Sequence, residues 1–495
     1  MSFYVSTRDS DIRVNASEAI LKGLSDEGGL FMLDEIPSLP LEEMIGMDFQ
    51  STAKVILKAM LSDFTQDEIN TCVEQAYTNK FETDECTPMV SVGDRYVLEL
   101  FHGPTSAFKD VALSILPRLM SLAKKKNKTQ EEIIILTATS GDTGSAALNG
   151  FSEVDGIRII VFFPDQGISA TQRAQMVTCN GKNVSVCAVK GNFDDAQSGV
   201  KAIFTSPETK NLSESNKLLF SSANSINIGR LIPQMVYYFK SYADLVNKGE
   251  ILPGEPVNFA VPTGNFGNIL AGYMAKLSGL PIAKLICASN SNNVLTEFLH
   301  SGVYDMRRNF LRTLSPSMDI LLSSNLERML YLSADRNPAT INRYMSELYR
   351  HGYYRVDDFV KNKIDETFYS GFCSDAETLE TIRNVYYDNG YLMDPHTAVA
   401  WKVSEDFKND QINFHKTIVL ATASPYKFAH SVLIALNQDG SGDEFSIIRR
   451  LQKLTGSPIP KNLMELENME VRHTSVIEKE EMTQYVYTKV GEQIW

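Results

Sequence analysis

Paired cysteines and long apolar runs are both missing from this sequence. Its six cysteines, spread over 495 residues, never form C-x-x-C, which argues against a zinc site and against a disulfide framework. No metal is therefore expected, and a reducing cytoplasm is the expected location. No stretch holds about 18 consecutive apolar residues, so no membrane span is expected. The start, MSFYVSTRDSDIRVN, is polar and does not read as a signal peptide.

Positive charge is also scarce. Lysine and arginine number 47 against 61 acidic residues, for a net charge of −14. A chain this acidic gains little from a phosphate backbone, so no nucleic-acid partner is expected, although a local pocket can still bind a small anion. The sequence lacks both G-x-G-x-x-G and G-x-x-x-x-G-K-[ST], which disfavours a nicotinamide site and a P-loop.

What the sequence does contain, along its middle, is one theme repeated. A short β-branched run leads into a small-residue turn and then into a helical pattern. Such strands, buried on both faces and alternating with helices, predict α/β units with largely parallel sheets. Ligands bind such sheets beyond the carboxyl ends of the strands, so the polar turns there are the candidate sites. The predicted strand and helix pairs are 133–136 with 145–151, 157–163 with 169–177, 184–189 with 194–204, 257–261 with 269–277, 285–288 with 294–300, and 417–421 with 426–436.

The two flanking regions look different. Residues 1–86 are predicted to be a small, mostly helical unit, with helices at 17–24, 41–45, 49–60 and 65–77. Residues 300–390 are predicted to be mainly helical, with breaks at Pro316 and Pro338.

The turn FHGPTSAFKD (101–110) places Lys109 in the first turn of a predicted helix. A cation is disfavoured there by the helix dipole. One interpretation is a solvated surface lysine. The other is an amine kept uncharged and nucleophilic by desolvation and positive potential, as a lysine that binds an aldehyde cofactor requires.

Three further turns follow strands. ATSGDTG (138–144) and PTGNFGN (262–268) each open a helix, so their backbone N–H groups could hold an anion. The alternative for both is an ordinary capped turn. In ATASP (421–425), either Thr422 or Ser424 could offer a hydroxyl to a ring nitrogen.

Taken together, the motifs resemble the longer, bacterial and fungal type of the threonine synthase family. The resemblance covers nearly the whole chain, and the order and spacing of its motifs carry it. They are STR (6–8), SEAILKGLSDEGGL (17–30), FHGPTSAFKD (101–110), ATSGDTGSAA (138–147), GNFDDAQ (191–197), NSINIGRLIPQ (224–234), PTGNFGN (262–268), SPSMDI (315–320), SSNLER (323–328), DPHTAVA (394–400) and ATASPYKF (421–428).

This resemblance implies an α/β fold of fold type II, like the β subunit of tryptophan synthase, with pyridoxal 5′-phosphate (PLP) between two α/β subdomains. Residues 1–86 would form the family's helical N-terminal domain, and residues 87–495 the catalytic region, with a helical insertion at about 300–390. Lys109 matches the lysine that binds PLP, and Thr422 the residue facing its ring nitrogen. The PLP phosphate would lie on Gly264, Asn265, Phe266, Gly267 and Asn268, and the substrate carboxylate on Thr139, Ser140, Gly141 and Thr143.

The implied activity converts O-phospho-L-homoserine and water to L-threonine and phosphate, in a monomer or homodimer. Arg8, Lys201 and Arg230 are candidate cations for the substrate phosphate because they lie in or beside the motifs. One alternative is another fold-type II lyase, either a serine or threonine dehydratase or a threonine-synthase-like phospho-lyase. The other is a non-catalytic binding protein with this fold.

The chain departs from the family pattern in places. Asp142 stands where many proteins of this fold have asparagine beside the cofactor's 3-oxygen, although the long-type threonine synthases share the aspartate. A carboxylate there would repel a phenolate, so Asp142 is expected to be protonated, turned away or paired. In ATASPYKF, Ser424 and Tyr426 replace a histidine and an alanine. His102 and His396 also lie in motifs, where structural hydrogen bonds are the expected role.

Overall fold

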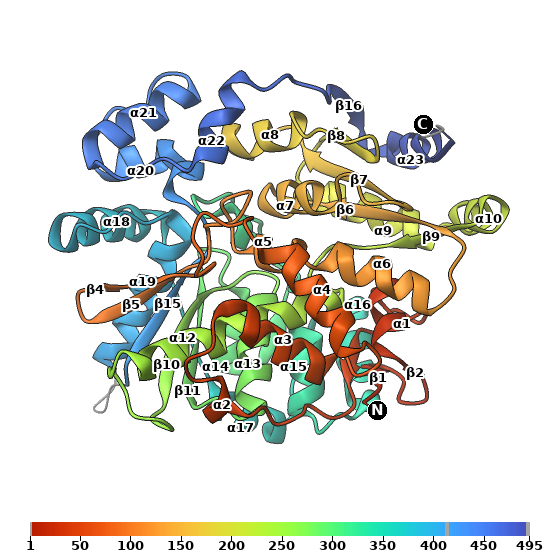
Figure 1. Ribbon diagram of the computed structural model, residues 1–495, viewed down its shortest axis with the longest axis horizontal. Coiled ribbons are helices and arrows are strands. Elements are labelled where there is room, and N and C mark those ends of the chain that lie inside the picture. The colour runs from red at the N-terminus through yellow and green to blue at the C-terminus, as the bar shows by residue number, and fades with distance from the viewer. Residues whose placement is uncertain (1, 411–414, 492–495) are drawn as a thin grey trace.

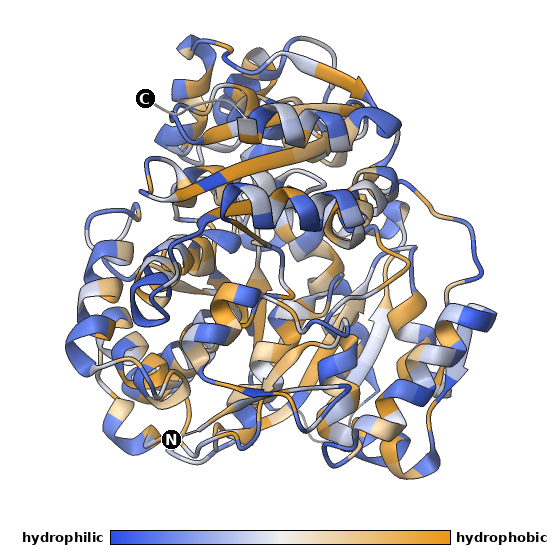
Figure 2. Cartoon of the chain, turned by 90° about the vertical axis from the view of Figure 1, so that its right-hand side faces the viewer, coloured by the Kyte–Doolittle hydropathy of each residue, from blue (hydrophilic) through white to orange (hydrophobic). Residues whose placement is uncertain are grey.

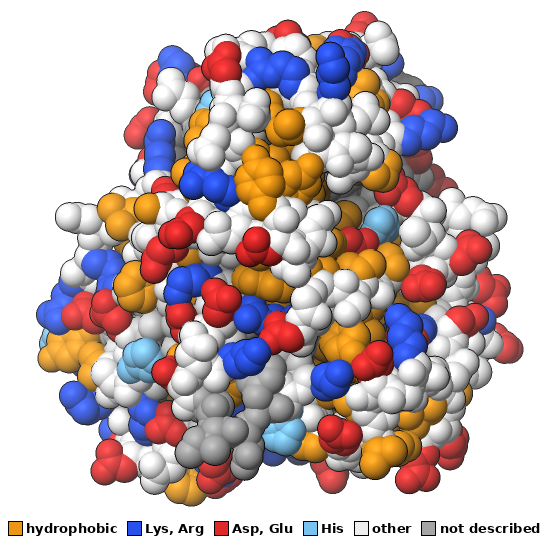
Figure 3. Space-filling model, turned by 90° about the vertical axis from the view of Figure 1, so that its left-hand side faces the viewer, with side chains coloured by type: hydrophobic (Ala, Val, Ile, Leu, Met, Phe, Trp, Pro, Cys, Tyr) orange, Lys and Arg blue, Asp and Glu red, His pale blue; other side chains and the backbone are white. Residues whose placement is uncertain are grey.

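The computed structural model describes residues 2–410 and 415–491. The main body has two lobes, each built on its own sheet, and the N-terminal segment lies against the larger one (Figure 1). Among the described residues, no helix is both long and apolar enough to cross a membrane. On the face drawn in Figure 3, acidic and basic side chains are interspersed between small apolar patches.

The upper lobe in Figure 1 holds a five-stranded sheet in the order β16-β8-β7-β6-β9. Its neighbouring strands are all parallel, as the repeated strand and helix pattern predicts. The strands are β6 (Glu132–Ala138), β7 (Ile157–Pro164), β8 (Val184–Lys190), β9 (Leu218–Ser221) and β16 (Ser475–Glu478). The helices around them are α7 (Asp142–Phe151), α8 (Ala170–Val177), α9 (Phe193–Thr205), α10 (Pro207–Asn216) and α23 (Met482–Gly491).

The lower lobe holds a six-stranded sheet in the order β14-β11-β10-β15-β5-β4. Its pairs are parallel except for the antiparallel pair of β4 (Met89–Val92) and β5 (Arg95–Glu99). The other strands are β10 (Val257–Pro262), β11 (Ile282–Ser289), β14 (Phe368–Phe372) and β15 (Thr417–Ala421). Helices of this lobe are α12 (Met235–Asn247), α13 (Gly267–Leu277), α14 (Val294–Ser301), α19 (Pro395–Asn409) and α20 (Ala429–Ala435). Figure 2 shows apolar residues concentrated on the inner strands of both lobes.

The N-terminal segment contains the four predicted helices, α1 (Ala16–Lys22), α2 (Leu41–Met44), α3 (Phe49–Met60) and α4 (Gln66–Tyr77). It also contains a small antiparallel sheet, β2-β1-β3, which the sequence did not predict. Its strands, β1 (Tyr4–Ser6), β2 (Arg13–Val14) and β3 (Phe31–Leu33), have only two or three residues each. Alternation cannot be recognised in runs that short.

The segment expected to be mainly helical holds α15 (Leu326–Ser333), α16 (Pro338–His351), α17 (Asp358–Thr367) and α18 (Asp375–Asn389). It also holds the antiparallel pair β12 (Val303–Asp305) and β13 (Tyr353–Arg355), and it contributes β14 to the main sheet. The sequence FYSGF of β14 has neither a long apolar run nor strict alternation, so it gave no strand signal. Pro338 opens α16 instead of breaking a helix, since proline is well tolerated at that position.

The other elements lie outside these groups. Pro117 separates α5 (Lys109–Leu113) from α6 (Leu116–Lys126), because proline is accepted in the first turn of a helix but not in its interior. The remaining pieces are α11 (Ile228–Leu231), α21 (Glu444–Thr455), α22 (Lys461–Glu465) and the 3-10 turns η1 (Ile232–Gln234), η2 (Pro316–Met318), η3 (Pro425–Phe428), η4 (Leu466–Asn468) and η5 (Lys479–Glu481).

Candidate active site

A cavity opens where the carboxyl ends of both sheets face each other. The turn after β6 lines it from the upper lobe, and the turns after β10 and β15 line it from the lower lobe, as expected for parallel sheets. The predicted site residues that line it are Lys109, Thr139, Ser140, Thr143, Arg230, Gly264, Asn265, Phe266, Gly267, Asn268 and Thr422. The structure thus brings together motifs that lie far apart in the chain.

Lys109 is the first residue of α5, as predicted, and its side chain is buried. Burial lowers the pKa of its amine to about 8, although Asp142 opposes the change and Arg230 and Lys427 reinforce it. The N–H of Phe108 donates to the carbonyl of Thr422 at 2.9 Å, which fixes this turn to the end of β15. The amine is therefore a buried, partly uncharged nucleophile, and the solvated surface interpretation does not fit it.

The turn between β10 and α13 forms a cradle for an anion. Phe266 has a φ of 60° and ends the turn, and α13 begins at the next residue. The first backbone N–H groups of this helix have no partner within the helix, so they can bind an anion. A Cβ at Gly264 would lie 2.9 Å from the carbonyl oxygen of Ser317, and one at Gly267 would lie 3.2 Å from the Cβ of Ser225. Glycine at position 264 is thus required because the backbone of residues 317 and 318 packs directly against it.

The side chain of Asn268 adds a donor to this cradle. Its Oδ1 accepts hydrogen bonds from the hydroxyls of Tyr237, at 2.6 Å, and Tyr238, at 2.9 Å. Its Nδ2 is buried and has no hydrogen-bond partner in the described part of the chain. A buried donor of this kind is costly unless a ligand satisfies it. A phosphate on the cradle would do so.

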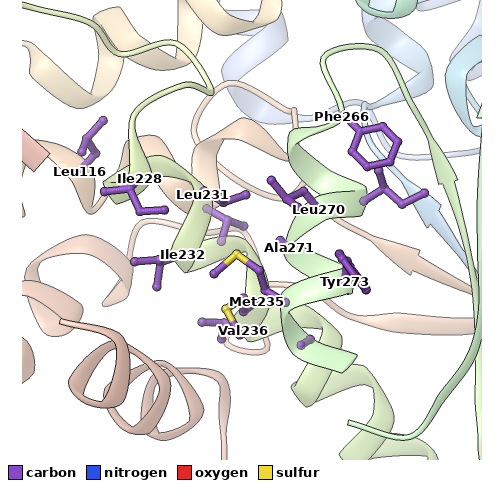
Figure 4. Packing of buried hydrophobic residues seen from close by; sticks show 14 of the residues in the cluster. Leu116, Ile228, Leu231, Ile232, Met235, Val236, Phe266, Leu270, Ala271 and Tyr273 are labelled. Atoms are coloured by element: carbon purple, nitrogen blue, oxygen red, sulfur yellow. The ribbon is translucent and has the colours of Figure 1, made fainter. Parts of the chain in front are cut away.

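An apolar cluster supports the cradle from below. In Figure 4, Leu270 and Ala271 of α13 lie beside Leu231 and Met235 of the neighbouring helices, and Phe266 lies apart from these two at the start of α13. Close packing of this kind resists small displacements, so the helix that carries the N–H groups is held in place.

These groups fit PLP. The fold-type II cofactor needs an amine for its aldehyde, donors for its phosphate and a polar group near its ring nitrogen. Lys109, the cradle of residues 264–268 and Thr422 supply these within one cavity. Ser424, the other hydroxyl considered for the ring nitrogen, is buried and accepts the N–H of Tyr426 instead. In residues 2–410 and 415–491, no group of three or more His, Cys, Asp or Glu side chains could hold a metal ion.

The turn after β6 lies on the other side of the cavity. The hydroxyl of Thr139 accepts the N–H groups of Gly141 and Gly144, each at 2.9 Å, and so shapes the turn. Gly141 has a φ of 130°, and a Cβ there would lie within 2.6 Å of three side-chain atoms of Gln172. Glycine is therefore required at position 141, which itself lies just behind the lining. The side chains of Ser140 and Thr143 remain at the cavity.

Asp142 is paired, which is one of the three states expected for it. Its Oδ1 accepts from the amine of Lys427 at 2.7 Å and from Nε2 of Gln172 at 2.9 Å. Its Oδ2 accepts from the hydroxyl of Ser317 at 3.1 Å and lies 3.9 Å from the amine of Lys109. Burial would raise the pKa of this carboxyl, but Lys427 and Lys109 outweigh it and hold that pKa well below its usual range. The group is therefore ionised.

The three candidate cations for a substrate phosphate lie in different places. Arg230 lines the cavity, with its Nη1 donating to the carbonyl of Ala223 at 2.9 Å. Arg8 lies outside the cavity lining and binds both carboxylate oxygens of Glu327, at 3.0 and 2.7 Å. Lys201 is exposed on α9 and is likewise not part of the lining. Only Arg230 is therefore placed for the expected role.

Both motif histidines make hydrogen bonds. His396 lines the cavity; its Nδ1 lies 2.7 Å from Oδ1 of Asp394, and its Nε2 accepts the N–H of Ser317 at 3.1 Å. These partners require a neutral ring with its proton on Nδ1. The ring of His102 lies 2.8 Å from a carboxylate oxygen of Glu99, outside the cavity lining.

Sequence reasoning missed several residues of the site. Lys427 and Ser317 lie within family motifs but have no pattern of their own that indicates a role, and Gln172 lies in no motif. Lys427 follows the end of β15, so the rule that singled out the other turns could have found it. Asn224, Ser225 and Gln234 also line the cavity and gave no signal of their own.

Comparisons with known proteins agree with this site. The family model "Threonine synthase N terminus" matches residues 3–77, "Pyridoxal-phosphate dependent enzyme" matches 90–422, and "Threonine synthase, C-terminal" matches 397–486. The chain is 36% identical to threonine synthase of Saccharomyces cerevisiae, over 94% of this chain and 96% of that one. It is 39% identical to Threonine synthase-like 1 of Homo sapiens over 88% of this chain, but it spans only 60% of that protein's length.

Solved structures show the same relationship. The PLP-bound threonine synthase from Brucella melitensis matches with a TM-score of 0.86 at 35% identity, covering 99% of this chain and 100% of that one. The yeast threonine synthase structure matches with a TM-score of 0.87 at 33% identity, covering 99% of both chains. The fold-type II architecture is therefore confirmed, and the chain belongs to the threonine synthase family of PLP-dependent enzymes.

Proposed function

We propose that this protein is a threonine synthase, which converts O-phospho-L-homoserine and water to L-threonine and phosphate in the cytoplasm. The observation that carries the proposal is the shared cavity of Lys109, the cradle of residues 264–268 and the turn of residues 139–143. A buried amine, a phosphate site and a carboxylate site are what this reaction needs. The six cysteines are free thiols, in keeping with a reducing compartment.

The residues around the cofactor have separable roles. Lys109 binds PLP, and Gly264, Asn265, Phe266, Gly267 and Asn268 hold its phosphate at the start of α13. Thr422 offers its hydroxyl to the ring nitrogen, and a neutral hydroxyl leaves that nitrogen less protonated than a carboxylate would. When bound, PLP supplies a conjugated ring that stabilises negative charge on the substrate carbons.

The residues on the substrate side bind two anions. The turn of Thr139, Ser140, Gly141 and Thr143 would hold the α-carboxylate at the start of α7, where helix N–H groups favour an anion. Arg230 would bind the phosphate that leaves from Cγ. Its guanidinium is buried at the cavity wall, so its attraction for an anion is little screened by solvent.

Lys109 would also move the protons. Its amine would accept the proton from Cα and pass it on to the conjugated system, so that it is uncharged again when it accepts the proton from Cβ and phosphate leaves Cγ. It would then give that proton to Cγ before water adds at Cβ. General base catalysis works best when the pKa of the base lies near the working pH. Burial lowers the pKa of the Lys109 amine to about 8, which meets that requirement.

The two altered positions of the ATASPYKF motif do not reach the cavity. Ser424 and Tyr426 are both buried, and neither belongs to the cavity lining; the Tyr426 hydroxyl donates to the carbonyl of Ser457 at 2.5 Å. These two replacements therefore give no reason to prefer a dehydratase.

One experiment tests the proposal directly. The purified protein, supplied with PLP and O-phospho-L-homoserine, should release threonine and phosphate in equal amounts. Lys109→Ala should lose the near-visible absorbance of bound PLP and all turnover, whereas Lys125→Ala, on an exposed position of α6, should keep both. Release of ammonia and a keto acid from serine or threonine instead would favour a dehydratase. A protein that never gains the PLP absorbance would favour a binding role.

A further inference from the structure

Two buried lysines share one carboxylate behind the cavity. Asp142 lies 2.7 Å from the amine of Lys427 and 3.9 Å from the amine of Lys109. The first distance is that of a charge-assisted hydrogen bond, and the second is beyond hydrogen-bonding range. One carboxylate can neutralise only one ammonium group, and these distances show that Asp142 is paired with Lys427.

Lys427 has no solvent-exposed surface. Besides Asp142, its amine donates to the carbonyl of Thr105 at 2.9 Å. Thr105 in turn gives its N–H and its hydroxyl to the carboxylate of Asp110, at 2.8 and 2.7 Å, next to Lys109 in the chain. Lys427 therefore touches the two segments that carry Asp142 and Lys109.

We propose that Lys427 is a positioning residue, which takes Asp142 as its own counter-ion and so favours the uncharged form of the Lys109 amine that the cofactor needs. This inference rests on the proposed role of Lys109 as the PLP-binding residue. The amine of Lys427 faces Asp142 and Thr105, so its role does not require contact with the substrate.

The other charges around Lys109 fit this arrangement. The charged groups that act on its amine are Asp142 from α7, Arg230 from α11, Lys427 from η3 and Asp110 from α5. Asp142 favours the charged amine, while Arg230 and Lys427 disfavour it. Removing Lys427 alone would leave Asp142 as an unshared counter-ion for Lys109. Removing the charge of Asp142 alone would leave Lys109 among cations.

This predicts shifts of opposite sign. The full-length chain, stripped of PLP, is mixed with PLP at a series of pH values, and the rate at which the bound absorbance returns is measured. Because only the uncharged amine attacks an aldehyde, the midpoint of this profile reports Lys109. Lys427→Met should move the midpoint upward by about one pH unit or more, and Asp142→Asn should move it downward. The double variant should return close to wild type, because the two influences cancel.

The double variant also controls for loss of stability caused by an unpaired buried charge. Lys427→Met leaves a buried carboxylate without its partner and can destabilise the chain, whereas Asp142→Asn with Lys427→Met buries no charge at all. Lys402→Met is the matched control, because it removes a lysine that is ion-paired to Asp406 on α19, and its profile should match wild type. Thermal melts identify any variant that does not fold.

Unchanged midpoints in folded Lys427→Met would overturn the inference, and so would a double variant shifted as far as Lys427→Met. The proposed function is tested separately, because the midpoint is read from PLP binding and needs no threonine. A wild-type protein that binds PLP but makes no threonine would refute the proposed function and leave the role of Lys427 standing. A wild-type protein that does not bind PLP would end both.

Discussion

Two arginines from family motifs were candidates for the substrate phosphate, and their surroundings give them different tasks. Arg230 reaches the cavity wall, whereas Arg8 is held by Glu327 away from the lining. We expect Arg230→Gln to raise KM for O-phospho-L-homoserine at least about tenfold, since it removes a charge-assisted contact of about 1.5–3 kcal/mol. Steady-state kinetics with the purified variant check this.

Arg8→Gln is the matched comparison. It should leave KM unchanged and lower the melting temperature, because it leaves the buried carboxylate of Glu327 without its bidentate partner. A rise in KM for Arg8→Gln that equals the rise for Arg230→Gln would contradict this division of roles.

The imidazole of His102 links protein stability to pH. Burial opposes its charge, but Glu82 and Glu99 outweigh burial and raise its pKa to about 9. In the unfolded chain the pKa of histidine is about 6.5. The stabilisation is therefore fully present below about pH 6.5 and is lost as pH rises towards 9.

The difference in melting temperature between wild type and His102→Gln should accordingly shrink between pH 6.5 and 9. His351→Gln, at an exposed position, should show no such trend. A constant difference across that range would show that His102 is not charged at neutral pH.

How far the site could be predicted is clearest at single residues. The cradle and Thr422 were accessible because each follows a predicted strand, and Lys109 was accessible because a distinctive motif places it in the first turn of a predicted helix. The pairing of Asp142 with Lys427 was not, because it joins residues that meet only when the two lobes come together. Arg8 was misleading because it lies in a family motif, although in the structure Glu327, which is far away in the sequence, binds it. A local sequence pattern contains no information about such a distant partner.

Among elements, the six strands of the repeated pattern and their helices were predicted to within a few residues, since their apolar runs are long and the turns between them are rich in glycine and proline. The short N-terminal strands were missed, and so were β4, β5, β9, β12, β13, β14 and β16. All of these except β5 are edge strands or very short, and the burial of such strands depends on tertiary packing that a local pattern does not record.

The position of Asn268 in the cofactor site depends on how helix α13 packs against its neighbours. A Cβ at Gly272 would lie 2.8 Å from the ring of Tyr238 and 2.9 Å from Cδ2 of Leu285. The hydroxyl of Tyr238 holds both the carbonyl and the side chain of Asn268. We expect Gly272→Ala to weaken PLP binding by about 1–3 kcal/mol, or roughly 5- to 150-fold, because overpacking displaces the cradle.

Titration of the stripped protein with PLP, followed by absorbance, measures this effect. Gly491→Ala is a suitable control, because a Cβ there would have no neighbour within 4 Å among the described residues. An unchanged dissociation constant for Gly272→Ala would mean that α13 tolerates the extra methyl group without moving Asn268.

At the scale of the whole molecule, the chain crosses between its lobes and ends in the upper one. After β15 and α20 of the lower lobe, β16 pairs with β8, and α23 packs on α9 (Figure 1). Met482 and Val486 are buried in an apolar cluster on one face of the upper sheet, whereas residues on its other face, such as Ile135 and Val161, belong to the same cluster as the lower lobe. The separate core on the first face predicts that this face can loosen while the rest of the molecule stays folded.

Met482→Asp tests that independence, because it puts an unpaired carboxylate into the upper core, at a cost of about 3–5 kcal/mol. Hydrogen exchange should then lose protection in β8 and α9 but keep it in β10 and α13. Val471→Asp, at a side chain that is 57% exposed, should change neither set of amides. If Met482→Asp exposed both sheets equally, the lobes would unfold as one cooperative unit. The shape of the cavity between them would then depend on the stability of the whole fold, because neither sheet could unfold without the other.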